Sequence, residues 1–224
     1  MVILGTGTGL RRTVFLSICH TDSAKRVAQA MVFSISLILA ASYLIGSIPF
    51  GILFGKAIRG KDPRSAGSGN IGFTNVFRVA GLLPAVLTLL GDFGKGALAA
   101  MIGKHFADIE VGMVSGLFAI LGHCYPIFLR FRGGKAVATS FGVLAILYPL
   151  VGFFTFGVWL ATVLGSRYVS LGSLVAFTSL PLMMAIFHTG LNAILVTVSI
   201  TVLIYLRHLE NISRLLLRKE NKVF

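Results

Sequence analysis

The sequence predicts an all-helical integral membrane protein with seven spanning helices. Of its 224 residues, 56% are hydrophobic and only 12% are charged, and the mean hydropathy is +0.91. A soluble domain of this length needs more polar residues to cover its surface. Long apolar segments also alternate with loops rich in Gly, Ser, Asn and Arg. These two observations place the chain among the polytopic membrane proteins.

The formal net charge of +13 has two explanations. A basic chain can bind nucleic acid, but basic loops in a membrane protein also collect on the cytoplasmic side. The hydropathy favours the second explanation, and we expect no nucleic-acid partner. The two cysteines, Cys19 and Cys124, fall in no metal or redox spacing, so the sequence predicts neither a disulfide framework nor a zinc site.

The first thirty residues differ from the rest of the chain. They are mixed in character and contain no apolar run of the ~7–15 residues that a signal peptide needs. Met31, by contrast, opens a long apolar segment. Either translation begins at Met31, or residues 1–30 form a tail on the membrane surface. We therefore expect an N-terminal extension over residues 1–30 and a single membrane domain over residues 31–224.

Seven apolar segments approach the ~20 residues that a membrane-spanning helix requires. The segment from Val137 to Leu164 is too long for one span, and Tyr148-Pro149 interrupts it. It therefore predicts a tight hairpin, with a shorter fourth span before Pro149 and a fifth after it. The other expected spans are Phe33–Phe54, Val79–Met101, Val111–Leu129, Val169–Phe187 and Leu191–Leu206.

The basic residues predict the orientation of these spans. With seven spans, fourteen Lys and Arg residues of the loops and the C-terminus fall on one side, whereas the opposite side holds only Lys104. The fourteen are Lys56, Arg59, Lys61, Arg64, Arg78, Arg130, Arg132, Lys135, Arg167, Arg207, Arg214, Arg218, Lys219 and Lys222. The positive-inside rule places them in the cytoplasm, with the N-terminus outside and the C-terminus cytoplasmic.

The loop after the first span contains a literal G-x-G-x-x-G over Gly67–Gly72. A dinucleotide-binding fold requires a strand before this motif, and here a membrane helix precedes it, so we reject that interpretation. The glycines still leave backbone N–H groups free to face an anion, and Arg64 and Arg78 add positive charge. The simpler alternative is a flexible, solvated linker between two spans.

Two further clusters have the same character. The run Arg132-Gly133-Gly134-Lys135 resembles part of a phosphate-binding loop, although Ala136 stands where a Walker motif needs Ser or Thr. Its alternative is ordinary positive-inside charge. Near the C-terminus, His208, Asn211 and Arg214 follow the seventh span, and His208 and Asn211 share a face if that helix continues.

Polar residues within the spans are fewer. Asp92 and Lys95 lie three residues apart in the second span and can pair with each other, and His123 lies in the third. We expect these groups to be structural. The Gly51-x-x-x-Gly55 and Gly112-x-x-x-Gly116 patterns predict close helix contacts.

Taken together, these segments resemble the bacterial acyl-phosphate:glycerol-3-phosphate acyltransferase family of small integral membrane enzymes. The resemblance covers nearly everything from Met31 onward. It lies in GSIPFG and DPRSAGSGNIGFTNVFR, in LGHCYPIFLRFRGGKAVAT, in a Tyr-x-Ser-x-x-Ser element at Tyr168, Ser170 and Ser173, and in RHLENISRLLLRKE. The chain departs from the family pattern at three positions. Ala136 and Arg218 stand where glycine is usual, and Phe73 replaces a small residue before Thr74.

The resemblance implies acyl transfer from a fatty acyl phosphate to the sn-1 hydroxyl of glycerol 3-phosphate, which gives lysophosphatidic acid and inorganic phosphate. It implies no metal, no other cofactor and no acyl-CoA, and a multi-pass enzyme of the bacterial inner membrane that works as a monomer with its site facing the cytoplasm. The matched catalytic positions are Ser68, Arg78, Lys135, Ser173, His208 and Asn211. The matched substrate-binding positions are Gly67, Gly69, Asn70, Thr74, Asn75, Gly133, Gly134, Arg214 and Glu220.

The residues suit this chemistry. An acyl phosphate is already activated, so the enzyme must mainly hold two anionic phosphates and aim a hydroxyl at a carbonyl carbon. The chain has no Ser-His-Asp arrangement and no His-x-x-x-x-Asp pair, which leaves His208 or the donor's own phosphate as proton acceptor. A phosphate-ester transporter would use the same basic residues as a vestibule, and a non-catalytic lipid-binding subunit is a third reading. Transporters, however, carry polar residues at mid-membrane, whereas here they cluster at one face.

Overall fold

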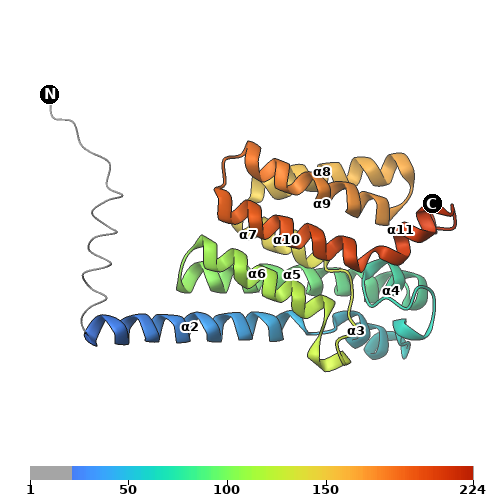
Figure 1. Ribbon diagram of the computed structural model, residues 1–224. Coiled ribbons are helices and arrows are strands. Elements are labelled where there is room, and N and C mark those ends of the chain that lie inside the picture. Colours follow the sequence, from blue (N-terminus) through green and yellow to red (C-terminus); the bar gives the residue numbers. More distant parts are fainter. Residues whose placement is uncertain (1–21, 224) are drawn as a thin grey trace. The chain divides into compact units, whose positions relative to one another are not determined.

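The computed structural model describes residues 22–223, and every regular element in that range is a helix (Figure 1). The α-helices are α2 (Asp22–Gly46), α3 (Phe50–Arg59), α4 (Phe73–Ala80), α5 (Leu82–Phe106), α6 (Ile109–Cys124), α7 (Val137–Leu147), α8 (Pro149–Ser166), α9 (Val169–Ile186), α10 (Leu191–Arg207) and α11 (Leu209–Leu216). Two 3-10 turns, η1 (Pro63–Ser65) and η2 (Ile127–Leu129), lie in the loops. The all-helical prediction is confirmed for this range.

The chain divides into two compact units after Leu37. Within the described range, the first unit consists of the N-terminal part of α2, which begins before Met31. The expected boundary at residue 30 therefore lies inside a helix. Residues 1–21, with Cys19 and most of the proposed extension, lie outside the described residues. The second unit starts at Ile38 and contains all the other elements.

The second unit is a helical bundle built around α5 and α6. Helix α5 packs against both α6 and α7, α8 packs against α9, and α9 packs against α10, which also contacts α6. The shared core is apolar and includes Met113, Ile120, Val143, Phe177, Leu180 and Ile204. Small residues bring the helices close, and a methyl group on Gly116 would lie 2.5 Å from Val143 Cγ1. Such close van der Waals packing is the main driving force for helix association in lipid.

Five helical segments are long and apolar enough to cross a membrane: Lys25–Arg59, Leu82–Phe106, Ile109–Leu129, Pro149–Ser166 and Val169–Ile186. A sixth forms if α10 and α11, which meet at a bend of 60°, are one broken span. Helix α7 is apolar but has only 11 residues, a length of about 16 Å at 1.5 Å per residue, roughly half of a ~30 Å hydrocarbon core. The predicted break before Pro149 is confirmed, because Pro149 opens α8.

One predicted span boundary and two expected helix continuations need correction. The expected first span, Phe33–Phe54, is interrupted between α2 and α3, where Pro49 precedes the first residue of α3. The second starts at Leu82 rather than Val79, because Gly81 takes a φ of +89° that ends α4. The seventh does not continue through His208, so His208 and Asn211 do not share one helix face. His208 is the junction itself, and Asn211 belongs to α11.

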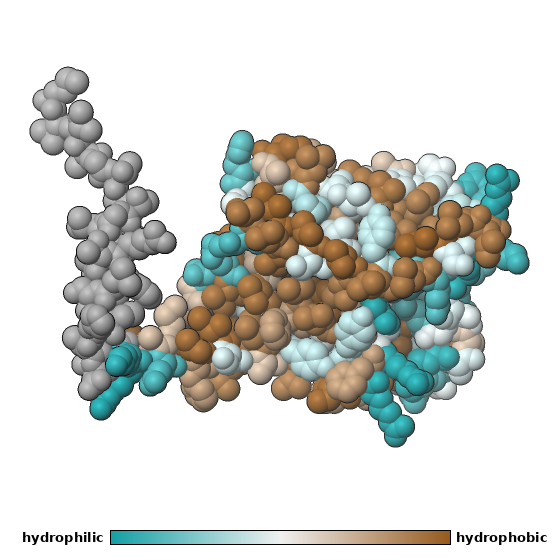
Figure 2. Space-filling view, viewed as in Figure 1, coloured by the Kyte–Doolittle hydropathy of each residue, from teal (hydrophilic) through white to brown (hydrophobic). Residues whose placement is uncertain are grey.

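Apolar side chains cover much of the face shown in Figure 2, over α6, α9 and α10, and teal polar residues gather beside α3, α4 and α11. The Gly112-x-x-x-Gly116 pattern makes the expected helix contacts. Gly51 instead fits α3 against the following loop, since a methyl group there would lie 1.8 Å from the carbonyl oxygen of Ile71. That contact fixes the loop at the polar end of the bundle.

Candidate functional site

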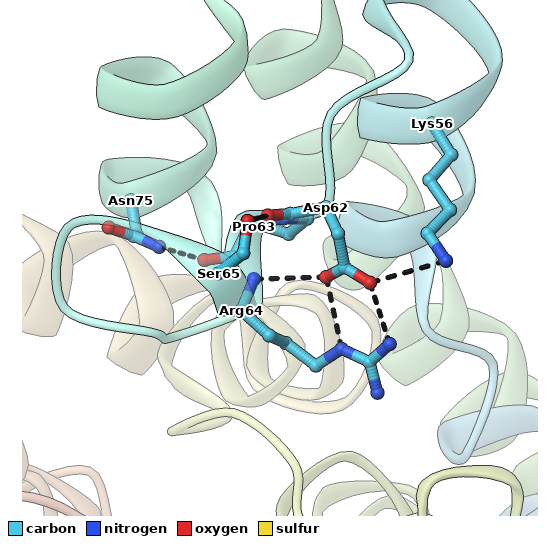
Figure 3. Close-up of polar contacts among 6 residues, drawn as sticks. All are labelled: Lys56, Asp62, Pro63, Arg64, Ser65 and Asn75. Carbon is cyan, nitrogen blue, oxygen red and sulfur yellow. Dashed lines mark hydrogen bonds and ion pairs between the residues drawn. The ribbon is translucent and has the colours of Figure 1, made fainter.

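The loop between α3 and α4 is organised by one buried side chain, Asn75 in the first turn of α4. Its Oδ1 accepts a hydrogen bond from the N–H of Ser68 at 2.8 Å. Its Nδ2 lies within hydrogen-bond distance of the carbonyl oxygens of Pro63, Ala66 and Asn70, at 2.7, 3.2 and 2.9 Å. Figure 3 shows Asn75 directed at this turn. The predicted substrate-binding residue Asn75 thus holds the loop in shape.

A salt bridge closes the outer side of the same loop. The guanidinium of Arg64 binds the carboxylate of Asp62 through Nε at 3.0 Å and Nη2 at 2.6 Å, and Lys56 lies 3.2 Å from the same carboxylate (Figure 3). Asp62 also accepts from the N–H of Arg64, as the N-cap of η1. The Arg64 hydrogen bond holds the pKa of Asp62 well below its usual range. The charge of Arg64 is therefore largely matched within the loop.

The other predicted residues of this loop differ in their surroundings. Ser68, Gly67, Gly69 and Arg78 are exposed, and Thr74 and Asn70 are half-buried. The side chain of Asn70 accepts from the N–H of Gly72, the N-cap of α4. Gly67 has a φ of +64°, and a methyl group there would lie 2.2 Å from Asn75 Oδ1. Ser68 in the loop and Arg78 on α4 thus keep accessible side chains beside a loop of fixed shape.

The loop before α7 is held by hydrogen bonds on both of its sides. The N–H groups of Gly133 and Gly134 donate to the carbonyl oxygens of Cys124 and His123, at 3.2 and 3.0 Å. Arg207 donates in turn to the carbonyl oxygens of Gly133 at 2.7 Å and Gly134 at 2.9 Å. These two N–H groups are therefore occupied within the protein, so an anion at this loop would meet its side chains, which include Arg130, Arg132 and Lys135.

Lys135 leads into a polar network at the end of the chain. Its ammonium donates to Oδ1 of Asn211, and Nδ2 of Asn211 donates to Oε1 of Glu220 at 2.6 Å. Arg214 Nε donates to the other oxygen of Glu220 at 2.8 Å. The structure thus brings together four predicted residues from two separate motifs.

Burial and charge tune this network in opposite directions. Burial lowers the pKa of Lys135 to about 8, opposed by the nearby Glu220 carboxylate. Hydrogen bonds from Arg214, Asn211 and Ser170 outweigh desolvation and hold the pKa of Glu220 below its usual value. A phosphate oxygen is chemically similar to the Glu220 carboxylate, so the donors that hold Glu220 are of the kind that bind phosphate.

His208 and Ser173 are both buried close to the ends of their helices. His208 Nδ1 lies 2.8 Å from the carbonyl oxygen of Ile204. Because a carbonyl oxygen only accepts, Nδ1 carries the proton and Nε2 keeps the lone pair. Ser173 donates to Val169 at 3.0 Å and accepts from the indole N–H of Trp159 at 3.3 Å. His208 therefore presents an unprotonated Nε2, while the Ser173 hydroxyl is held in place.

A cavity of about 960 Å³ lies between the two basic loops. Its charged lining is strongly cationic and consists of Asp62, Arg64, Arg130, Arg132 and Arg207. Gly69 and Gly133 are the predicted site residues that line it. The volume falls within the range of ~300–1,000 Å³ typical of small-molecule sites. The cavity therefore suits an anionic ligand held between the first and second loops.

Sequence reasoning missed two residues that support the site. Arg207 was counted only as a cytoplasmic charge, yet it clamps the Gly133–Gly134 loop and lies 5.3 Å from the centre of the Tyr125 ring. Ser170 donates to Glu220 at 2.8 Å. Ser170 lies in the Tyr-x-Ser-x-x-Ser element, a signal that was available but did not identify its partner. Over residues 22–223, no three His, Cys, Asp or Glu side chains gather as a metal site would require.

Comparison with known proteins gives a consistent match. The model of the glycerol-3-phosphate acyltransferase family matches residues 36–218. A glycerol-3-phosphate acyltransferase of Carboxydothermus hydrogenoformans is 47% identical over 84% of this chain and 96% of its own. One from Syntrophotalea carbinolica is 43% identical over 84% of this chain and 97% of its own.

Solved structures agree with the sequence relatives. PlsY (YgiH), an integral membrane glycerol 3-phosphate acyltransferase, has been solved in a glycerol 3-phosphate form. That structure superposes with a TM-score of 0.82 at 41% identity and covers 85% of this chain and 96% of its own. Its lysophosphatidic acid form gives a TM-score of 0.79 over 84% of this chain and 95% of its own.

Proposed function

Because the chain belongs to the glycerol-3-phosphate acyltransferase family, we propose that it transfers a fatty acyl group from acyl phosphate to the sn-1 hydroxyl of glycerol 3-phosphate. The products are lysophosphatidic acid and inorganic phosphate. The observation that carries the proposal is the convergence of Lys135, Asn211, Arg214 and Glu220 in one hydrogen-bonded network. It lies in the same bundle as a cationic cavity between the two basic loops.

The reaction needs positioning more than activation. The glycerol hydroxyl attacks the carbonyl carbon of the acyl phosphate, the bond from that carbon to the phosphate oxygen breaks, and the hydroxyl proton leaves. Acyl phosphate is a mixed anhydride with phosphate as a good leaving group, so holding the two reactants together supplies much of the rate. Nε2 of His208 is one acceptor for the proton, and an oxygen of the donor phosphate is the other.

We assign the site residues to two roles. Lys135 with Arg214, Ser68 and Arg78 provides charge and hydrogen bonds to the phosphates, and the glycines and Asn70, Thr74 and Asn75 of the two loops set the backbone that presents them. His208, Asn211 and Ser173 align the reacting groups, and Glu220 holds Asn211 and Arg214 in position. The glycerol 3-phosphate and lysophosphatidic acid forms of PlsY support a site of this kind.

A direct assay tests the proposal. Purified protein is supplied with acyl phosphate and glycerol 3-phosphate, and phosphate release and lysophosphatidic acid are measured together. We expect equal amounts of both products, no activity with acyl-CoA in place of acyl phosphate, and no loss of activity with a chelator. Robust turnover of acyl-CoA would remove the acyl-phosphate assignment, and transport of glycerol 3-phosphate without product would favour the transporter alternative.

We propose further that residues 31–224 form one domain with seven spans, in which α7 is a short fourth span and α10 with α11 a broken seventh. In this arrangement the N-terminus is outside the bacterial inner membrane and the site faces the cytoplasm, where both substrates are soluble at their phosphate ends. A reporter fused to the C-terminus should report cytoplasmic, and one between Lys104 and Glu110 should report external. The same side for both would defeat the seven-span arrangement, and sedimentation in detergent tests the expected monomer.

A further inference from the structure

Three ionisable side chains meet inside the bundle, beneath the loop that leads to Lys135. Asp92 and Lys95 of α5 pair at 2.7 Å, which confirms the pairing expected from their spacing. His123 of α6 brings its Nδ1 within 3.3 Å of the same oxygen of Asp92, in a geometry that forms no hydrogen bond. The exposed fractions of the three side chains are 2% to 5%. None of them belongs to the reaction described above.

Buried charges in a membrane protein are costly and are usually kept for a specific role. The contacts that Lys95 and His123 make outside this group indicate what that role is. Lys95 Nζ donates at 2.9 Å to the carbonyl oxygen of Ile48, in the break between α2 and α3. Lys95 therefore satisfies a carbonyl at the point where the chain turns toward the first basic loop.

His123 touches the second basic loop. Its carbonyl oxygen accepts from the N–H of Gly134, and its ring lies so close that a methyl group on Gly134 would stand 2.1 Å from Nε2. The glycine therefore fits the ring of His123, and the height of the loop above α6 depends on where that ring sits. The next residue along the chain is Lys135, whose ammonium binds Asn211.

We propose that Asp92, Lys95 and His123 form a buried positioning device, which fixes the Gly133–Gly134 loop, and with it Lys135, relative to the break between α2 and α3. Asp92 is the shared centre, Lys95 holds the break and His123 supports the loop. The device acts on the reaction only through Lys135, so its kinetic consequences rest on the proposed function.

Substitutions that change the size of the side chains at positions 123 and 134 test the contact between the His123 ring and Gly134. Gly134→Ala forces the ring of His123 aside, and His123→Ala removes the support of the loop. Each should raise KM for glycerol 3-phosphate about tenfold or more while kcat falls less, since misplacing a positioned group by ~1 Å can cost up to ~10²-fold. The double variant leaves room for the added methyl group, so it should perform better than Gly134→Ala alone.

Thr155→Val is the matched control. Thr155 is another fully buried polar residue without a hydrogen-bond partner for its hydroxyl, and it lies on α8. Its replacement should leave kcat and KM unchanged. If a general loss of packing caused the effects, Gly134→Ala would not be rescued by His123→Ala, and the inference would be wrong.

A second measurement is independent of catalysis. The rate at which an amine-reactive reagent labels Lys135, followed by mass spectrometry over a pH series, gives the apparent pKa of its amine. The wild-type pKa is lowered to about 8, and in His123→Ala it should rise toward the ordinary 10.5 as the loop loosens and water reaches the ammonium. An unchanged labelling profile would overturn the inference. If the wild-type protein fails to turn over acyl phosphate, the proposed function fails and this labelling alone decides.

Discussion

The loop between α3 and α4 is held by its own side chains, whereas the loop before α7 is held by residues from distant helices. In the first, Asn75 and Asp62 bind partners at most 12 residues away. In the second, Arg207 and Asn211 reach across 74 and 76 residues. The first loop is therefore a local unit, which packs against α3 where Gly51 meets Ile71. The second depends on the packing of α6, α10 and α11 and transmits any change in it to Lys135.

The largest effect is expected where the distant contacts of the second loop converge. Asn211→Ala removes the link between Lys135 and Glu220, and we expect kcat to fall by ~10²-fold or more, because the aligned groups lose their shared partner. Steady-state kinetics with both substrates measures this. Asn192→Ala is the control: Asn192 binds Glu110 at 3.0 Å from the opposite end of α10, and its loss should leave kcat unchanged. Equal kinetics for Asn211→Ala and wild type would remove Asn211 from the site.

Substitutions in the first loop should lower the stability of the protein more than they lower the rate of the reaction. Asn75→Ala leaves three loop carbonyls and one N–H without their partner, and unmade buried hydrogen bonds cost about 1–3 kcal/mol each, less what water recovers. We expect a loss of about 2–4 kcal/mol in the free energy of unfolding, read from thermal unfolding in detergent. Asn70→Ala removes a single bond to Gly72 and should cost about 1 kcal/mol. Similar losses for the two variants would show that Asn75 does not organise the loop.

The dependence of stability and KM on pH should distinguish the two loops, because the amine of Lys135 in the second loop titrates near pH 8. Its pKa is about 8 in the folded protein and about 10.5 when unfolded. Between those values the unfolded chain binds more protons, so the melting temperature should rise as pH increases from 8 to 10.5. Over the same interval the ammonium is lost, and KM for glycerol 3-phosphate should rise about tenfold per pH unit above 8. In Lys135→Met the rise in melting temperature with pH should disappear.

The smallest effect is expected for the salt bridge of the first loop. Asp62→Asn breaks its contacts with Arg64 and Lys56, and because these side chains are partly exposed the loss should be at most ~1 kcal/mol. The pKa of Asp62 is lowered in the folded state. Its contribution is therefore present above about pH 4 and is lost only as pH falls through the folded value. Melting curves at pH 5 and pH 8 should show the same difference between variant and wild type. A difference that vanishes at pH 5 would contradict this.

The contrast between the loops also marks the limits of prediction from sequence. Hydropathy and Pro149 located most helices, and the spacing of Asp92 and Lys95 gave their pairing. The sequence did not reveal that His123 and Cys124 occupy the N–H groups of Gly133 and Gly134, nor that Arg207 clamps the opposite side. Periodicity reports which face of a helix is apolar, but it does not report which distant side chain lies opposite.

Two of the three departures from the expected family pattern, Ala136 and Arg218, occur at backbone positions that favour glycine. Ala136 and Arg218, which stand where glycine is usual, have φ values of +57° and +54°. This left-handed region favours glycine and costs other residues about 1–2 kcal/mol. Both positions flank the network, one beside Lys135 and the other two residues before Glu220. The usual glycines are thus explained by conformation, and the chain accepts the strain of larger residues.

The carboxylate of Glu220 bonds to Ser170, 50 residues earlier in the sequence. A ribosome adding roughly 5–20 residues per second needs about 2–10 s to make that interval. During this time the chain up to Ser170, which includes Lys135, has already been synthesised. The hydrogen-bond donor of Ser170 does not yet have its carboxylate acceptor. Until Glu220 is made, the donor of Asn211 lacks the same carboxylate partner. The network around Lys135 is in this sense completed late, because its carboxylate is synthesised after the donors that bind it.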